Sequence, residues 1–126
     1  VHRVYTLSHS DQRKNDSECH CSNGPAREGN TFIGIFPDNC ELDAQTDKDA
    51  KIPVAVQVAG TVSTKVHYGS YGEQTPAVGS LVYWHAAEEH LTVEDDGDLP
   101  VVGRLVSIVD GFNNLAHATV HLTHDN

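Results

Sequence analysis

Ala77-Val78-Gly79-Ser80-Leu81-Val82-Tyr83-Trp84 recurs further along the chain in a related form, Val101-Val102-Gly103-Arg104-Leu105-Val106-Ser107-Ile108. In each copy an apolar pair precedes a glycine, and a short apolar run follows it. Pro76 and Pro100 stand directly before the two copies. A proline and a glycine beside a run rich in β-branched residues are typical of a turn that enters a strand. The repeated pattern therefore predicts two β-strands in the C-terminal third.

Similar strand patterns extend outward from this repeat. Residues 52–58 alternate strictly, with Ile52, Val54, Val56 and Val58 on one face of an extended chain. Residues 31–36, 61–66 and 116–122 are further apolar or alternating runs. The chain thus contains about seven short strands separated by turn residues, the pattern of a small antiparallel β-sandwich or barrel. We predict an all-β fold.

The length of 126 residues favours a single domain. Residues 31–126 carry the strand patterns and form the predicted β domain. Residues 1–30 are polar and irregular apart from an apolar start, so we predict an extended N-terminal arm or loop. Two alternatives stay open for this segment, an arm that becomes ordered against a partner and a surface loop that packs on its own domain.

Charge and cysteine content restrict the partners and the compartment. The formal net charge is −10, which disfavours nucleic acid and anionic membranes as partners. No apolar run is long enough to span a membrane. The first residues lack the apolar region of a signal peptide, and the three cysteines are an odd number. We therefore expect synthesis in a reducing cytoplasm, without a disulfide framework.

The cysteines are the candidate metal ligands of the sequence. Cys19, Cys21 and Cys40, together with a histidine, would supply the ligands of a Cys₃His zinc site. The Cys-x-Cys spacing departs from the usual zinc pattern, and a second pair is missing. Reduced loop thiols are therefore the favoured interpretation, and a disulfide from Cys40 to Cys19 or Cys21 is a further alternative. We expect no metal or cofactor.

The nine histidines give no stronger indication of a metal site. His117 and His121 share one strand face, but at ~3.3 Å per residue their Cα atoms lie about 13 Å apart. That separation is too large for one ion. His85 and His90 flank a predicted hairpin turn and could come close. A third ligand is missing from the local sequence, so this pair alone predicts no metal site.

No enzyme motif accompanies these patterns. Glu88 and Glu89 are adjacent, so on a strand they would point to opposite faces and form a poor catalytic pair. The acidic residues 94–98 lack the ligand spacing of a calcium loop and are interpreted as a solvated turn. Nucleotide-binding loops, nucleophile elbows and zinc-protease motifs are absent from the sequence. We do not expect an enzyme.

Tyr83 and Trp84 are neighbours within a predicted strand, so one ring points into the core and the other points outward. Tyrosine and tryptophan are enriched at the centres of protein interfaces. The outward ring of this pair is therefore a candidate interface residue.

Four blocks carry a resemblance to a known family. They are residues 29–35, residues 51–62, the region around the repeat (78–84, 91–92 and 102–106) and residues 118–122. In this order and spacing they resemble the capsid decoration (cement) proteins of tailed bacteriophages. The N-terminal stretch with Cys19 and Cys21 has no counterpart in that pattern, so the resemblance does not extend to it.

The resemblance implies a structural virion protein on the outer capsid surface, which stabilises the head by bridging subunits of the major capsid protein. It also implies self-association, as a homotrimer in preference to a dimer, and no catalytic residues. Val4, Tyr5 and Leu7 would be the residues that add a strand to a neighbour's sheet. The alternative is a carbohydrate- or receptor-binding β module with Tyr83 or Trp84 as its platform. A buried Trp84 would count against that alternative.

Overall fold

A computed structural model describes residues 1–12, 21–68, 77–94, 97–112 and 115–123. The first half of the chain forms a four-stranded sheet, called sheet A, with the strand order β1-β4-β3-β2. Its strands are β1 (His2–Leu7), β2 (Pro25–Glu28), β3 (Thr31–Ile35) and β4 (Ile52–Gln57). The short helix α1 (His9–Gln12) and the 3₁₀ turn η1 (Glu41–Ala44) accompany this sheet.

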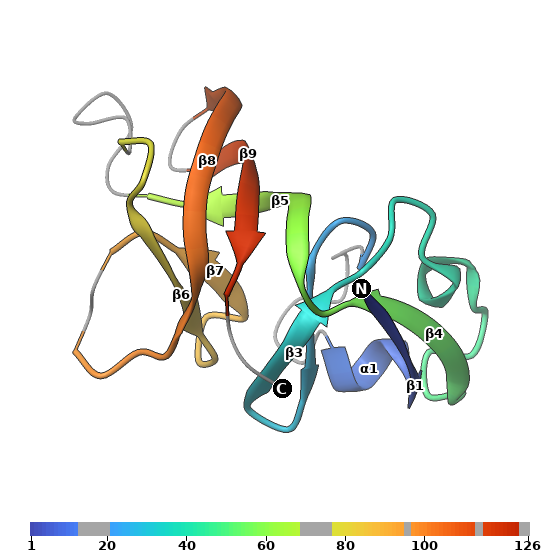
Figure 1. Cartoon of the computed structure of the whole chain (residues 1–126). Helices are drawn as coiled ribbons and strands as arrows, with labels where there is room; N and C mark the ends of the chain where they lie inside the picture. The colour runs from blue at the N-terminus through green and yellow to red at the C-terminus, as the bar shows by residue number, and fades with distance from the viewer. Residues whose placement is uncertain (13–20, 69–76, 95–96, 113–114, 124–126) are drawn as a thin grey trace.

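The second half of the chain forms a closed barrel with the order β5-β7-β6-β8-β9. Its strands are β5 (Gly60–His67), β6 (Leu81–His85), β7 (His90–Thr92), β8 (Val101–Phe112) and β9 (Leu115–Leu122). Figure 1 shows the barrel and sheet A side by side, with β5 leading from one to the other. The predicted all-β class is confirmed. No helix in the described part of the chain has the length and apolar character needed to cross a membrane.

Both strands predicted from the repeated pattern are present, and they pair with each other. β6 and β8 are antiparallel, with Val82 opposite Gly103. The two glycines have different roles, however. Gly79 lies in a turn before β6 with φ of +93°, whereas Gly103 lies within β8. A Cβ at Gly103 would overlap the carbonyl oxygen of His121 on β9, so this position requires the close approach that only glycine permits.

Strand β4 shows the predicted alternation. Val54 and Val56 are buried, and the intervening Pro53 and Ala55 are exposed. β1 pairs with β4 in antiparallel register along its whole length, from His2 opposite Gln57 to Leu7 opposite Ile52.

The N-terminal segment therefore differs from the expected arm. Residues 2–7 and 25–28 are the two edge strands of sheet A. Leu7 is buried in the sheet A core and Tyr5 packs against it. The backbone groups on one side of β1 find hydrogen-bond partners on β4 of the same chain, so β1 is ordered without a partner protein. Residues 13–20 were also part of the predicted arm, and they lie outside the described residues.

Two apolar cores stabilise the two sheets, and β3 contributes to both. The sheet A core includes Phe36, Leu42 and Val56. The barrel core contains Trp84 and also takes in Phe32 from β3. Because β3 supplies side chains to both cores, sheet A and the barrel are packed against each other through shared apolar contacts.

Candidate functional site

Trp84 is the central residue of the junction between sheet A and the barrel. Its side chain is 1% exposed. The indole Nε1 donates a hydrogen bond of 2.8 Å to the backbone oxygen of Asn30, in the turn between β2 and β3. The ring of Phe32 lies 5.9 Å from the Trp84 ring between centroids. Trp84 is therefore unavailable as a surface residue. Of the two neighbouring rings, one of which was predicted to point into the core, Trp84 lies inside and Tyr83 is half-buried.

An ion pair reinforces the same junction. Arg27 Nη2 lies 3.3 Å from Glu89 Oε1, and the two side chains are 4% and 6% exposed. The guanidinium also donates from Nη1 to the backbone oxygen of Ala86 and from Nε to that of Asp11. Gln12 holds the backbone of Arg27 by accepting from its N–H and donating to its C=O, each at 2.8 Å. Glu89 thus has a structural partner across the junction.

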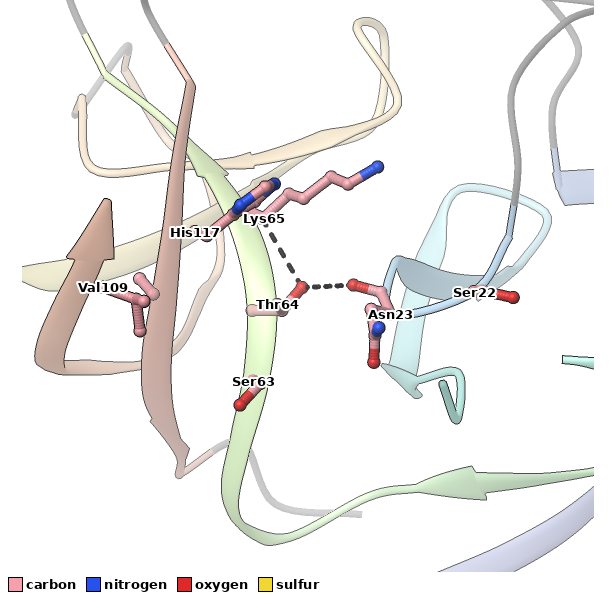
Figure 2. A pocket seen from close by; sticks show the side chains of 8 residues that line it. Ser22, Asn23, Ser63, Thr64, Lys65, Val109 and His117 are labelled. Atoms are coloured by element: carbon pink, nitrogen blue, oxygen red, sulfur yellow. Dashed lines mark hydrogen bonds between the residues drawn. The ribbon is translucent and has the colours of Figure 1, made fainter. Parts of the chain in front are cut away.

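A cleft of about 380 Å³ lies beside this junction. It is lined by polar side chains of β5, by Ser22 and Asn23 from the first half of the chain, and by Val109 and His117 from β8 and β9. Figure 2 shows the Thr64 hydroxyl in the middle of the cleft, where it donates to the backbone oxygen of Asn23 at 2.9 Å. Its described lining residues do not combine a nucleophile with a base and a group that orients that base, the arrangement that nucleophilic catalysis requires.

Three imidazoles gather at one end of β5, β6 and β7. The rings of His67 and His90 stack with centroids 3.9 Å apart, and His85 approaches His90 edge-on at 5.7 Å. Burial, together with the neighbouring imidazoles, lowers the pKa of His90 to about 4. Burial also lowers the pKa of His67. The sequence suggested His85 with His90 but did not group His67 with them, because the parallel contact between β5 and β7 leaves no signal in local spacing.

Stacking limits what these imidazoles can bind. The lone pairs of an imidazole lie in the plane of its ring. In two stacked rings they run alongside each other and do not converge on one point. A shared metal would require the stack to open. The arrangement is better suited to packing neutral rings against each other than to coordination.

The structure describes two of the three cysteines that the sequence singled out as candidate metal ligands. Cys19 lies outside the described residues. Cys21 and Cys40 are both buried in the sheet A core. Burial raises the pKa of the Cys40 thiol to about 11, so without a metal this thiol stays protonated near neutral pH. His9 and Asp43 each place a donor atom within 4.8 Å of the Cys21 sulfur, and the sequence gave no reason to group these two residues with Cys21.

This thiol, imidazole and carboxylate also match the chemistry of a cysteine nucleophile with its base. Cys21 is 0% exposed, however, and His9 is 5% exposed. A substrate cannot reach a fully buried sulfur without local unfolding. The described structure therefore does not present this group as a working nucleophilic site.

The described residues include an exposed apolar surface on each half of the molecule. We define the β1 surface by Val4, Pro53 and Ala55, which share the outer face of β1 and β4. Val4 is 70% exposed, and β1 is an edge strand of sheet A. Of the predicted strand-adding residues, Val4 is thus accessible, whereas Tyr5 is half-buried and Leu7 is buried.

The second surface, the β8 surface, lies on the outside of the barrel. Val101, Val106 and Val109 of β8 are 40%, 44% and 72% exposed. His117 and His121 project outward from the neighbouring β9, where the alternation predicted from the sequence is confirmed by the burial of Ala118, Val120 and Leu122. Three exposed valines thus lie along this one strand, and an exposed apolar stretch of this kind is a candidate contact surface.

Comparison with known proteins gave no relative, since no family model, curated protein sequence or solved structure matches the chain.

Proposed function

We propose that this protein is a capsid decoration protein, a structural virion component that binds the outer capsid surface and bridges subunits of the major capsid protein. The observation that carries the proposal is the pair of exposed apolar surfaces on two different halves of one molecule. A protein that links two neighbours needs two separate contact surfaces. The β1 surface lies on sheet A and the β8 surface lies on the barrel, and a buried junction joins them.

Contacts across the junction would hold the two halves of such a link together. A bridge transmits force only if its two halves do not separate under load. The Trp84–Asn30 hydrogen bond and the Arg27–Glu89 ion pair both cross from sheet A to the barrel. Charged pairs that are withdrawn from water are strongly destabilised when one partner is removed. The structure therefore supports a unit that moves as one body between its two contacts.

The edge of β1 supports a specific mode of contact. An edge strand offers backbone donors and acceptors to an extended segment of another protein, which then joins the sheet. Val4 would lie beside the added strand and contribute apolar area. Many such contacts on a symmetric lattice give high avidity even when each one is weak. The net charge of −10 would favour a capsid segment with basic residues.

Self-association belongs to the same proposal. We propose a homotrimer in preference to a dimer, placed where three capsid subunits meet, because closed symmetric assemblies match the local symmetry of such lattice positions. The proposed site of action is the outer surface of the virion. Burial of Trp84 counts against the carbohydrate-binding alternative, which keeps only the half-buried Tyr83 as its platform.

Binding to stripped heads tests the proposal through one variant on each surface. We would measure co-sedimentation of the protein with heads of a tailed phage from which this component has been removed. Val4→Lys and Val109→Lys should each weaken binding about tenfold or more, about 1.4 kcal/mol, by placing a charge in an apolar contact. Thr46→Lys adds the same charge at an exposed position outside both surfaces and should bind like the unaltered protein. Equal binding by all three variants would contradict the bridging geometry.

A further inference from the structure

His9, Cys21 and Asp43 bring three different donor groups together from three separate segments. His9 begins α1, Cys21 lies shortly before β2, and Asp43 belongs to η1. One donor atom from each residue lies within 4.8 Å of the other two. His9 Nε2 and Asp43 Oδ1 are 3.8 Å apart.

The distances between these donor atoms are close to the distances between the ligand atoms of a bound metal ion. Zinc bonds to nitrogen, oxygen and sulfur measure about 2.0–2.3 Å, so donors in a tetrahedral site are separated by about 3.3–3.7 Å. The three donor atoms all lie within 4.8 Å of one another, so their separations exceed these values by at most about 1.5 Å. Binding of one ion would draw the three donor atoms closer together than they lie in the metal-free chain.

The surroundings of the three residues are those of a buried metal site. His9 and Cys21 are 5% and 0% exposed, and the Asp43 side chain is 16% exposed. Cys21 belongs to the sheet A core. A buried charged group is costly unless it is paired or coordinates a metal. One thiolate and one carboxylate balance the two positive charges of a divalent ion, so the loaded site would be neutral with an uncharged imidazole.

A second layer of hydrogen bonds already orients the carboxylate. Asp43 accepts from the backbone N–H of Cys21 at 2.6 Å, and from the N–H and the hydroxyl of Ser22 at 2.9 Å and 2.6 Å. The Ser22 hydroxyl in turn accepts from the N–H of Cys40 at 3.1 Å. Metal-binding carboxylates are typically held by such outer contacts, which fix their direction and tune their affinity.

We propose that His9, Cys21 and Asp43 form a binding site for one divalent transition-metal ion, with zinc as the best match to this donor set. A water molecule would complete the fourth position. The ion would connect α1, the segment before β2 and η1, and would hold α1, which follows β1 directly, against the rest of sheet A. The inference does not depend on capsid binding, because it concerns the stability of the chain alone.

Titration of the full, tag-free chain with Co²⁺ and Zn²⁺ after removal of metal by a chelator tests the site. One equivalent of Co²⁺ should bind and give a thiolate-to-cobalt charge-transfer band, which Zn²⁺ should abolish by displacement. Cys21→Ser should lose the band. His9→Asn and Asp43→Asn should weaken Zn²⁺ binding by more than the ~10- to 100-fold that loss of an outer-layer contact costs.

Two control variants separate this site from other thiols and imidazoles. Cys40→Ser should keep the band, and His2→Asn, at an exposed histidine, should keep the affinity. Zn²⁺ should also raise the melting temperature of the unaltered protein but not of His9→Asn, which provides a readout if Cys21→Ser does not fold. Absence of stoichiometric binding, or a band that survives in Cys21→Ser, would overturn the proposal.

Discussion

The indole nitrogen of Trp84 and the backbone oxygen of Asn30 form a 2.8 Å hydrogen bond that joins the barrel to sheet A. The two residues are far apart in the chain, and each belongs to a different sheet. A buried tryptophan is usually hydrogen-bonded, because its N–H would otherwise lose its hydrogen bond to water and gain no other partner. This contact makes Trp84 an internal anchor whose loss should affect both halves of the molecule.

Trp84→Ala should lower the free energy of unfolding by about 3–5 kcal/mol, as expected for truncation of a buried tryptophan. Trp84→Phe keeps most of the apolar contact but leaves the Asn30 oxygen without this donor, and should cost about 1–3 kcal/mol. Tyr83→Phe, at the half-buried neighbour, serves as the control with a change of about 0.5 kcal/mol or less. Urea denaturation measures all three. Equal stability of Trp84→Phe and the unaltered protein would show that the hydrogen bond contributes nothing.

Arg27→Met should be strongly destabilising, by about 3–5 kcal/mol, because it removes the guanidinium from the buried Glu89 carboxylate. The double variant Arg27→Met/Glu89→Leu should recover part of this loss, since it removes both charges. The exposed ion pair of Lys51 and Asp11, with side chains 63% and 51% exposed, provides the matched control. Lys51→Met should cost about 1 kcal/mol or less. A small effect of Arg27→Met in the same denaturation assay would contradict this account of the junction.

Acid should destabilise the protein through the stacked histidines. The pKa of His90 is lowered to about 4 in the folded state, while in the unfolded chain it is about 6.5. Between these two pKa values, His90 is therefore neutral in the folded state and protonated in the unfolded state. This contribution to stability is complete above about pH 6.5 and is lost as the pH falls towards 4.

The variant His90→Phe keeps a ring for stacking on His67 but cannot be protonated. Its loss of stability between neutral pH and about pH 5 should be smaller than that of the unaltered protein. Glu88 and Lys65 act on His67, and His85 acts on His90, so the variant leaves the other charges of the cluster in place. Parallel pH profiles for the two proteins, measured by denaturant midpoint, would rule out His90 as a source of the acid sensitivity.

Gly103→Ala should destabilise the barrel by about 1–3 kcal/mol, because the added methyl group would press on the carbonyl oxygen of His121 and separate β8 from β9. Ser107→Ala, at an exposed position of the same strand, should change stability by about 0.5 kcal/mol or less. Thermal unfolding of the two variants checks the difference. A Gly103→Ala protein as stable as Ser107→Ala would mean that β8 and β9 can move apart freely.

The strands were predictable where their side chains alternate. Val54 and Val56 in β4, and Ala118, Val120 and Leu122 in β9, bury the faces that the sequence indicated. This succeeded because the period of a strand is a local property, readable from neighbouring residues. The sequence did not decide between a sandwich and a barrel, because that choice depends on which strands pair. In the structure, β5 closes the barrel by a parallel contact with β7.

The candidate sites were less predictable because they depend on contacts between distant segments. Arg27 pairs with Glu89, and His67 stacks on His90, across different strands. Local spacing carries no signal for either contact. Val4, Tyr5 and Leu7 were predicted to form a strand, but the polar character of residues 1–30 concealed β2 and the pairing of β1 with β4 of the same chain. Polar composition alone therefore does not distinguish an arm from an edge strand with one exposed face.

The most direct test of the central claim is a cryo-electron microscopy reconstruction of stripped phage heads after incubation with the purified protein. The account predicts added density at regular lattice positions on the outer capsid surface. In each copy, the β1 surface and the β8 surface should face different capsid subunits. Heads that show no added density at saturating protein, or density in which only one half of the molecule touches the capsid, would contradict the proposed bridging role.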